Sequence, residues 1–157
     1  MEYRGKVVIV TGASSGIGFV TAREFARRGA AVIGVARRKE RLEELMRECR
    51  TDSPTSSFLC GDLGERQFAE HVIHDTLERF GRVDVLVNNA AISKHKHVLH
   101  LTPEEADHVM RVNFMSSVWT TLAVLPSMLT AGGGSIINVS SFAAKVTPPR
   151  EGIYAAS

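Results

Sequence analysis

A glycine-rich segment near the start of the chain, residues 11–18 with the sequence TGASSGIG, most narrowly limits the fold. Before it lies KVVIVT at residues 6–11, where apolar residues do not alternate with polar ones. Such a run predicts a strand buried on both faces, as in a parallel sheet. After it, residues 16–29 carry Val20, Phe25 and Ala26 at helical spacing and end on Gly29. The sequence therefore predicts a strand, a tight turn and a helix, the opening unit of a parallel α/β fold.

The three glycines of this turn suit the binding of a dinucleotide pyrophosphate. Gly12 lets the chain leave the strand in a tight turn, Gly16 leaves space for the pyrophosphate, and Gly18 permits close helix–strand packing. The free amides and the positive end of the helix favour an anion there. An ordinary turn is the alternative, but the strand before and the helix after favour a cofactor site. The candidate ligands are Gly12, Ser14, Ser15, Gly16, Ile17 and Gly18.

Strand-like and helix-like segments alternate along the rest of the chain. Strands are predicted at residues 31–35, 57–60, 83–87 and 135–139, and helices at residues 38–50, 65–80 and 103–130. This order predicts one Rossmann-like domain over residues 1–157, an α/β fold with a doubly wound parallel sheet and right-handed crossovers.

Local signals refine these helices. Thr102 and Glu105 have the spacing of a capping box at the start of the long helix, and Pro126 is expected to kink its end. After Ser141 we expect no clear helix until one begins at Tyr154. The apolar face of the 38–50 helix is expected to comprise Leu42, Leu45, Met46 and Cys49.

Composition and charge exclude several classes of protein. With 157 residues, of which 44% are hydrophobic, the chain can bury a real core. The net charge is +2, and the two basic runs, 37–39 and 94–97, are short and lack aromatic residues, so we expect no nucleic-acid partner. Two cysteines make no disulfide framework and fit a reducing compartment. Because we find neither a signal peptide nor an apolar stretch of membrane-spanning length, we expect a cytoplasmic protein without a membrane partner.

The end of the second predicted strand bears on the choice of dinucleotide. A carboxylate at this point would bond the ribose hydroxyl of NAD and repel the extra phosphate of NADP. Here Ala36 is followed by Arg37 and Arg38, and a guanidinium matches a phosphate in charge and geometry. We therefore expect NADP(H) to be favoured over NAD(H), with Arg37 as the main phosphate ligand and Arg38 in support. The alternative is that both arginines only solvate the start of the next helix.

Three histidines, His95, His97 and His100, cluster after the fourth predicted strand. A metal site needs three or four convergent ligands, and these histidines share their segment with lysines. We expect no metal site, and place them at a substrate entrance or facing solvent.

Three motifs together resemble the classical short-chain dehydrogenase/reductase family. They are TGxxxGIG at residues 11–18, NNAA at residues 88–91 in place of the family's NNAG, and a serine at 141 followed by Tyr154. If position 91 needed a positive φ, alanine there would cost about 1 kcal/mol. The resemblance extends over nearly the whole chain but only over the front part of the family's domain.

The resemblance implies further cofactor contacts after the third and fourth strands. Asp62 would meet the adenine amino group, and the backbone of Leu63 would meet the adenine ring. A lone aspartate after a strand is otherwise a common turn former. Asn89 and Ala90 would contact the cofactor, whereas Asn88 is expected to satisfy neighbouring backbone groups.

The resemblance also implies catalytic roles for Asn113, Ser141 and Tyr154. Ser141 would bond the substrate oxygen, with Ser140 as its structural neighbour, and Tyr154 would act as general acid or base. Asn113 lies within the long helix, where the family has a helix distortion and holds a water for proton relay. The alternative is that the Asn113 side chain only bonds a neighbouring backbone group. A free tyrosine has a pKa of about 10, and the family's lysine, which would fall at position 158, lowers it. We therefore expect the chain to be a fragment of a longer enzyme.

These expectations combine into one function and one alternative. The first is an NADP(H)-dependent oxidoreductase that interconverts a carbonyl and a secondary alcohol on a small-molecule substrate by hydride transfer. The alternative is a non-catalytic dinucleotide-binding module or an inactive fragment. In the family the long helix also helps to build a homo-oligomer interface. Without the neighbouring helix that packs beside it in the family, we expect it to expose Phe114, Val118, Leu122 and Leu125.

Overall fold

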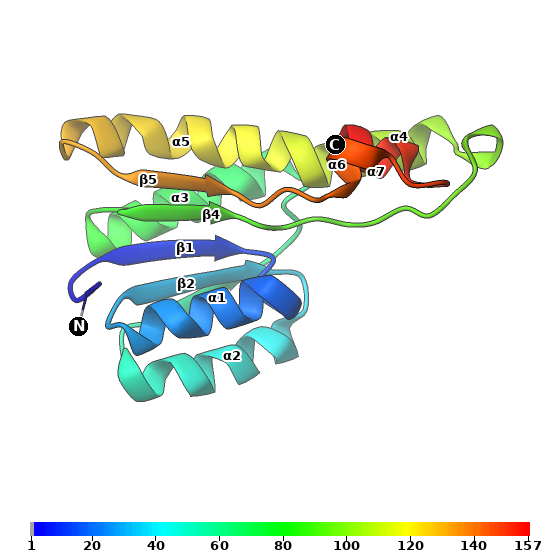
Figure 1. Ribbon diagram of the computed structural model, residues 1–157. Helices are drawn as coiled ribbons and strands as arrows, with labels where there is room; N and C mark the ends of the chain where they lie inside the picture. The colour runs from blue at the N-terminus through cyan, green and yellow to red at the C-terminus, as the bar shows by residue number, and fades with distance from the viewer. Residues whose placement is uncertain (1) are drawn as a thin grey trace.

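Five parallel strands form one sheet in the order β3-β2-β1-β4-β5 (Figure 1). The computed structural model describes residues 2–157. The strands are β1 Val7–Thr11, β2 Ala31–Ala36, β3 Ser57–Cys60, β4 Val85–Asn88 and β5 Ser135–Asn138. Strands β2 and β3 lie on one side of β1, and β4 and β5 lie on the other. The point where the order reverses therefore lies between β1 and β4, where doubly wound sheets bind ligands.

Helices cover both faces of the sheet, as predicted (Figure 1). One face carries α1 Gly16–Arg27 and α2 Lys39–Asp52, and the other carries α3 Arg66–Phe80 and α5 Ser116–Thr130. The remaining elements are η1 Val98–His100, α4 Pro103–Met110, the π-helix η2 Arg111–Met115, α6 Ala143–Val146 and α7 Gly152–Ala156. Helices α4, α6 and α7 lie beyond the carboxyl ends of the strands (Figure 1). Helix α4 and η2 form the first part of the long helix, which continues through α5.

The first strand shows why the sheet is buried on both sides. Val8 and Val10 pack against the α1 and α2 side, whereas Ile9 packs against the α3 and α5 side. All three are fully buried. Burying such a side chain stabilises the fold by about 1.5–3 kcal/mol. The parallel α/β fold class is therefore confirmed, and so is the apolar face of α2, whose four predicted residues are all buried.

Several predicted boundaries and faces were wrong. In α1 the buried positions are Gly18, Ala22 and Ala26, while Val20 is 60% exposed. Small residues occupy this face because the helix approaches the sheet closely. The chain also forms α6 and α7 after Ser141, and α7 begins two residues before Tyr154.

The long helix has the predicted extent, because α4, η2 and α5 run without a break from Pro103 to Thr130. It contains the π-helical segment η2, and α5 continues past Pro126. Pro126 lies on an exposed side, where water can bond the Leu122 carbonyl that the proline leaves without a helical donor. The whole stretch Pro103–Thr130 has 28 residues and is long and apolar enough to cross a membrane by length and composition alone. The expectation that no apolar stretch reaches that length was therefore wrong.

Candidate functional site

The glycine-rich turn joins β1 to α1 and sits against the start of the loop after β4. Gly12 has φ +67°, and a Cβ there would lie 2.8 Å from Nδ2 of Asn89. A Cβ on Gly18 would lie 2.5 Å from the Gly12 carbonyl oxygen. Neither position has room for a side chain, so both glycines serve close packing. Gly16 differs, because its φ is +56° and a Cβ would meet nothing within 4 Å. The open space at Gly16 suits the approach of a ligand to the helix end.

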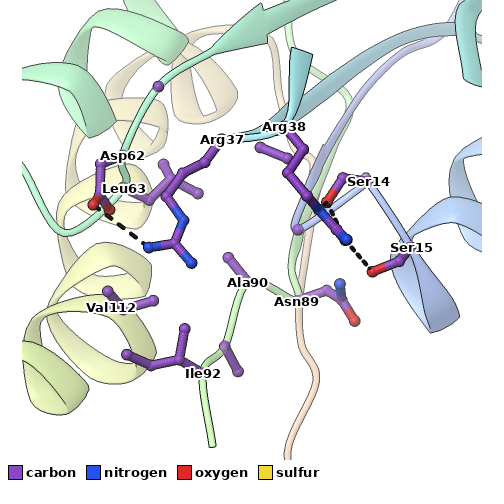
Figure 2. Close-up of a pocket in the computed structure, with 14 residues that line it drawn as sticks. Ser14, Ser15, Arg37, Arg38, Asp62, Leu63, Asn89, Ala90, Ile92 and Val112 are labelled. Carbon is purple, nitrogen blue, oxygen red and sulfur yellow. Dashed lines mark hydrogen bonds and ion pairs between the residues drawn. The ribbon is translucent and has the colours of Figure 1, made fainter. Parts of the chain in front are cut away.

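The start of α1 leaves its backbone amides available to a ligand. Ser15 is the N-cap residue, yet within residues 2–157 its side chain makes no capping bond. Instead Arg38 donates hydrogen bonds to the hydroxyl oxygens of Ser14 (3.0 Å) and Ser15 (2.7 Å), as Figure 2 shows. This arrangement adds a guanidinium charge to the positive end of the helix, which favours an anion.

A pocket of about 290 Å³ opens between this turn and the ends of β2, β3 and β4 (Figure 2). The guanidinium of Arg37 reaches across it and lies 3.9 Å from the Asp62 carboxylate. Oδ1 of Asp62 also accepts a hydrogen bond from the Gly64 amide (2.9 Å), the turn-forming contact that a lone aspartate often makes. The structure therefore brings nine predicted cofactor ligands together around one pocket: Gly12, Ser14, Ser15, Arg37, Arg38, Asp62, Leu63, Asn89 and Ala90.

The two asparagines after β4 have different surroundings. Asn88 is buried and bonds three side chains, those of Thr120, Thr121 and Asn138. We had expected backbone partners for Asn88, and that expectation was wrong. Asn89 lines the pocket, and its side-chain amide donates to the Thr11 carbonyl (3.0 Å). Asn89 therefore ties the β4 loop to the end of β1 and also faces the ligand space.

Alanine at position 91 fits its backbone without strain. Among the described residues, only Thr147 and Arg150 are non-glycine residues with positive φ. Ala91 therefore has an ordinary φ, and the replacement of the family's glycine costs no left-handed conformation.

The π-helix η2 places Asn113 at its centre. Oδ1 of Asn113 accepts from the Ile92 amide (2.8 Å), and Nδ2 donates to the Ile92 carbonyl (3.0 Å) and to the Ser157 hydroxyl (2.8 Å). The helix distortion that the resemblance implies is present. The alternative explanation, a bond from Asn113 to neighbouring backbone, is also met, by the two bonds to Ile92. π-Helical turns of this kind are frequent at functional sites.

A second cavity, of about 740 Å³, joins the three predicted catalytic residues. Asn113 comes from η2, Ser141 from the loop after β5, and Tyr154 from α7, and all three line it. The Ser141 hydroxyl accepts from the Ala143 amide (3.1 Å), which fixes the serine at the start of α6. Asn89 and Ala90 border both this cavity and the first pocket, so the two are adjacent.

The three clustered histidines, His95, His97 and His100, are exposed. Nδ1 of His95 lies 3.0 Å from Oε1 of Glu151, and the centroids of the His97 and His100 rings lie 6.0 Å apart with the rings tilted at 56°. Residues 2–157 contain no group of three or more histidine, cysteine, aspartate or glutamate side chains that could hold a metal ion. Neither cysteine is disulfide-bonded, and burial raises the pKa of the Cys49 thiol to about 11, so it stays protonated at neutral pH.

Sequence reasoning missed two contributors to the site. The buried Thr11 hydroxyl accepts from the amides of Asn89 (2.9 Å) and Ala90 (3.0 Å) and donates to the Val87 carbonyl (3.2 Å). A threonine directly before the first glycine was a visible signal. Ser157 was the other residue missed, and its partner lies 44 residues away, so no local pattern could reveal it.

Comparison with known proteins identifies the family. The family model described as short chain dehydrogenase matches residues 6–157, nearly the entire chain. The chain belongs to the short-chain dehydrogenase family. The predicted resemblance is thus confirmed.

Relatives and solved structures agree with this assignment. The chain is 43% identical to "11-beta-hydroxysteroid dehydrogenase 1A" of Arabidopsis thaliana, covering 98% of this chain and 44% of the relative. It is 36% identical to the "3-oxoacyl-[acyl-carrier-protein] reductase FabG" of Thermotoga maritima, covering 100% of this chain and 64% of that one. The crystal structure of L-sorbose reductase from Gluconobacter frateurii, complexed with NADPH and L-sorbose, superposes with a TM-score of 0.94 at 30% identity. That match covers 99% of this chain and 60% of the reductase, so the chain spans about half the length of such relatives.

The residues of this short-chain dehydrogenase fit a nicotinamide dinucleotide. The crowded glycines at 12 and 18, the open space at 16 and the uncapped α1 terminus form a cradle for a pyrophosphate. A metagenomic short-chain oxidoreductase solved in complex with NADP, at 33% identity, has the same fold with a TM-score of 0.94.

Proposed function

We propose that the full-length protein is an NADP(H)-dependent oxidoreductase that interconverts a carbonyl and a secondary alcohol. One observation carries the proposal: Asn113, Ser141 and Tyr154 come from three separate segments and line one cavity beside the glycine-turn pocket. A hydroxyl donor, a phenol and a structured asparagine in one cavity suit proton transfer to or from a substrate oxygen.

In this proposal the chain's own residues handle the substrate oxygen. Ser141 donates a hydrogen bond to that oxygen and polarises the carbonyl. In reduction Tyr154 gives its hydroxyl proton to the oxygen as the alcohol forms, and in oxidation the phenolate takes the proton back. When bound, the nicotinamide supplies or accepts the hydride at the carbonyl carbon. Asn113 holds the β4 loop and α7 in place around the cavity.

We also propose that NADP(H) is preferred to NAD(H). The residues after β2 include Arg37 and Arg38, and Arg37 lines the first pocket without an acidic residue before it. The Asp62 carboxylate at 3.9 Å is an exchangeable partner, since both side chains are more than one-third exposed. A phosphate with two negative charges would compete well for such a guanidinium. The similar structures that hold NADPH or NADP support this preference.

The decisive experiment replaces Tyr154 by phenylalanine in the full-length protein. Removal of the hydroxyl takes away the proton donor, so kcat should fall by roughly 100- to 10,000-fold while the Kd for NADPH stays unchanged. Turnover is followed by NADPH oxidation with a steroid ketone, a 3-oxoacyl thioester and L-sorbose, chosen after the named relatives. Tyr3→Phe is the matched control, because Tyr3 packs on Phe25 at the other end of the sheet. Unchanged turnover in Tyr154→Phe would exclude the proposed role, and NADPH binding without turnover of any carbonyl would favour a binding module.

A further inference from the structure

Tyr154 lies in α7, Gly152–Ala156, and the position of its phenol depends on the contacts that this helix makes with other segments. A misplacement of about 1 Å at a reacting group can cost about 100-fold in rate.

The amino-terminal end of α7 is held by the loop that follows β4. The Lys96 amide donates to the Arg150 carbonyl (2.9 Å), and His95 lies 3.0 Å from Glu151, the residue before the helix. Arg150 has φ +68°, a conformation that a non-glycine residue holds only when its surroundings impose it. These contacts fix where the helix begins.

The hydroxyl of Ser157, one helical turn after Tyr154, connects α7 to the long helix. This hydroxyl accepts a hydrogen bond from Nδ2 of Asn113 (2.8 Å) and donates one to the Tyr154 carbonyl (2.8 Å). It thus links the side chain of the π-helical asparagine directly to the backbone of the tyrosine. Asn113 uses its other amide hydrogen and its oxygen on Ile92, so its orientation is fixed.

We propose that Ser157 is a positioning residue for the reaction, setting the height and rotation of Tyr154 against Asn113. This inference rests on the proposed function, because it assumes that Tyr154 transfers the proton. Ser157 also lines the 740 Å³ cavity, but its single hydroxyl proton is donated to the Tyr154 carbonyl, so it acts through Tyr154 and not as a donor to the substrate.

The test compares Ser157→Ala with Ser157→Thr in the full-length protein. Alanine removes both hydrogen bonds, so kcat should fall by about 10- to 100-fold with the Kd for NADPH and the KM for substrate unchanged. Threonine keeps the hydroxyl and should restore most of kcat. Ser127→Ala is the matched control, because the Ser127 hydroxyl also bonds a carbonyl three residues earlier in its helix (Val124, 2.8 Å) but has no partner on another segment in the described structure.

Several outcomes would overturn the inference. Wild-type kcat in Ser157→Ala would do so, and so would an equal loss in the alanine and threonine variants or in Ser127→Ala. If Ser157→Ala does not fold, Ser157→Cys keeps the volume and weakens both bonds, and it should show the same selective loss of kcat. Tyr154→Phe measured beside these variants separates the two claims. If Tyr154→Phe is inactive and Ser157→Ala is normal, the role of Ser157 fails while the proposed function stands.

Discussion

At the residue scale, the two adjacent arginines after β2 have different partners and should have separable effects. Arg37 spans the pocket towards Asp62, whereas Arg38 bonds the serines of the glycine turn. Loss of Arg37 should weaken NADPH binding by about tenfold or more and leave NADH binding unchanged, since a charge-assisted bond to phosphate contributes about 1.5–3 kcal/mol. Loss of Arg38 should weaken the binding of both cofactors, because it loosens the turn that they share.

The measurement is calorimetric titration of Arg37→Ala and Arg38→Ala in the full-length protein with each cofactor. Arg47→Ala is the control, since Arg47 is an exposed arginine further along α2. Equal losses of NADPH and NADH affinity in Arg37→Ala would show that Arg37 does not read the 2′-phosphate.

The sequence indicated which residue types surround the cofactor pocket but not how each one is used. Adjacent side chains in an extended segment point in opposite directions, so one of Arg37 and Arg38 had to face the glycine-rich turn. The sequence does not indicate which of the two does so. Asn113 could be singled out because asparagine is unfavourable within a helix. Its three partners, on Ile92 and Ser157, come from tertiary structure and could not be predicted from local sequence.

At the element scale, Glu105 joins the start of α4 to the loop after β4. It completes the capping box with Thr102 and also lies 2.8 Å from Lys94 and 2.7 Å from Lys96. Hydrogen bonds from Lys94 and Lys96, and then from the Thr102 amide, lower the pKa of this carboxyl from 4.5 to about 2. Because the pKa is lower in the folded state, the stabilisation is fully present above about pH 4.5 and is lost as pH falls towards about 2.

Glu105→Gln should therefore lower the free energy of unfolding near neutral pH, and the difference from wild type should shrink as pH falls from about 5 to about 2. Urea denaturation of the full-length protein at several pH values measures this. Glu104→Gln is the matched control, because Glu104 occupies the same first turn of α4 and feels the same helix dipole. A difference that does not vary with pH would contradict a role for the Glu105 charge.

The elements themselves were predictable where the signal is local and long. The capping box of α4 and the glycine stop of α3, where Gly81 has φ +71°, follow from sequence spacing alone. The helices α6 and α7 have four and five residues, too few to show a helical period. The helix distortion at η2 was expected only through the family resemblance.

At the scale of the whole molecule, topology was the most predictable property. Strand–helix alternation together with right-handed crossovers predicted a doubly wound sheet, whereas its order β3-β2-β1-β4-β5 came from the structure, because more than one order satisfies both rules. The cofactor pocket then has to lie at the carboxyl ends of β1 and β4. Surface exposure was harder to predict: Phe114 is 48% and Leu122 is 64% exposed as expected, but Val118 and Leu125 are half-buried.

The long helix leaves apolar side chains exposed in the described part of the chain. Leu122 and Leu129 are 64% and 76% exposed, and only 28% of the helix's most apolar window is buried in the chain. Within residues 2–157 nothing covers this apolar surface, and surface of this kind packs against another segment or a second molecule. We propose that the full-length protein self-associates through this helix. Leu122→Glu and Leu129→Glu would then each bury an unpaired charge and raise the dissociation constant by roughly 100-fold or more.

Light scattering of the full-length protein measures this association. Val98→Glu is the control, since Val98 is 74% exposed but lies in η1, outside the long helix. A monomeric wild-type protein, or one whose mass is unchanged by both leucine substitutions, would contradict the proposal. A different result would show that this helix face contacts a bilayer: wild-type protein would co-sediment with phospholipid vesicles, and both glutamate substitutions would abolish the co-sedimentation. A buried glutamate is unfavourable in a protein interface and in a bilayer, so the substitutions alone do not separate the two cases, whereas binding to vesicles does.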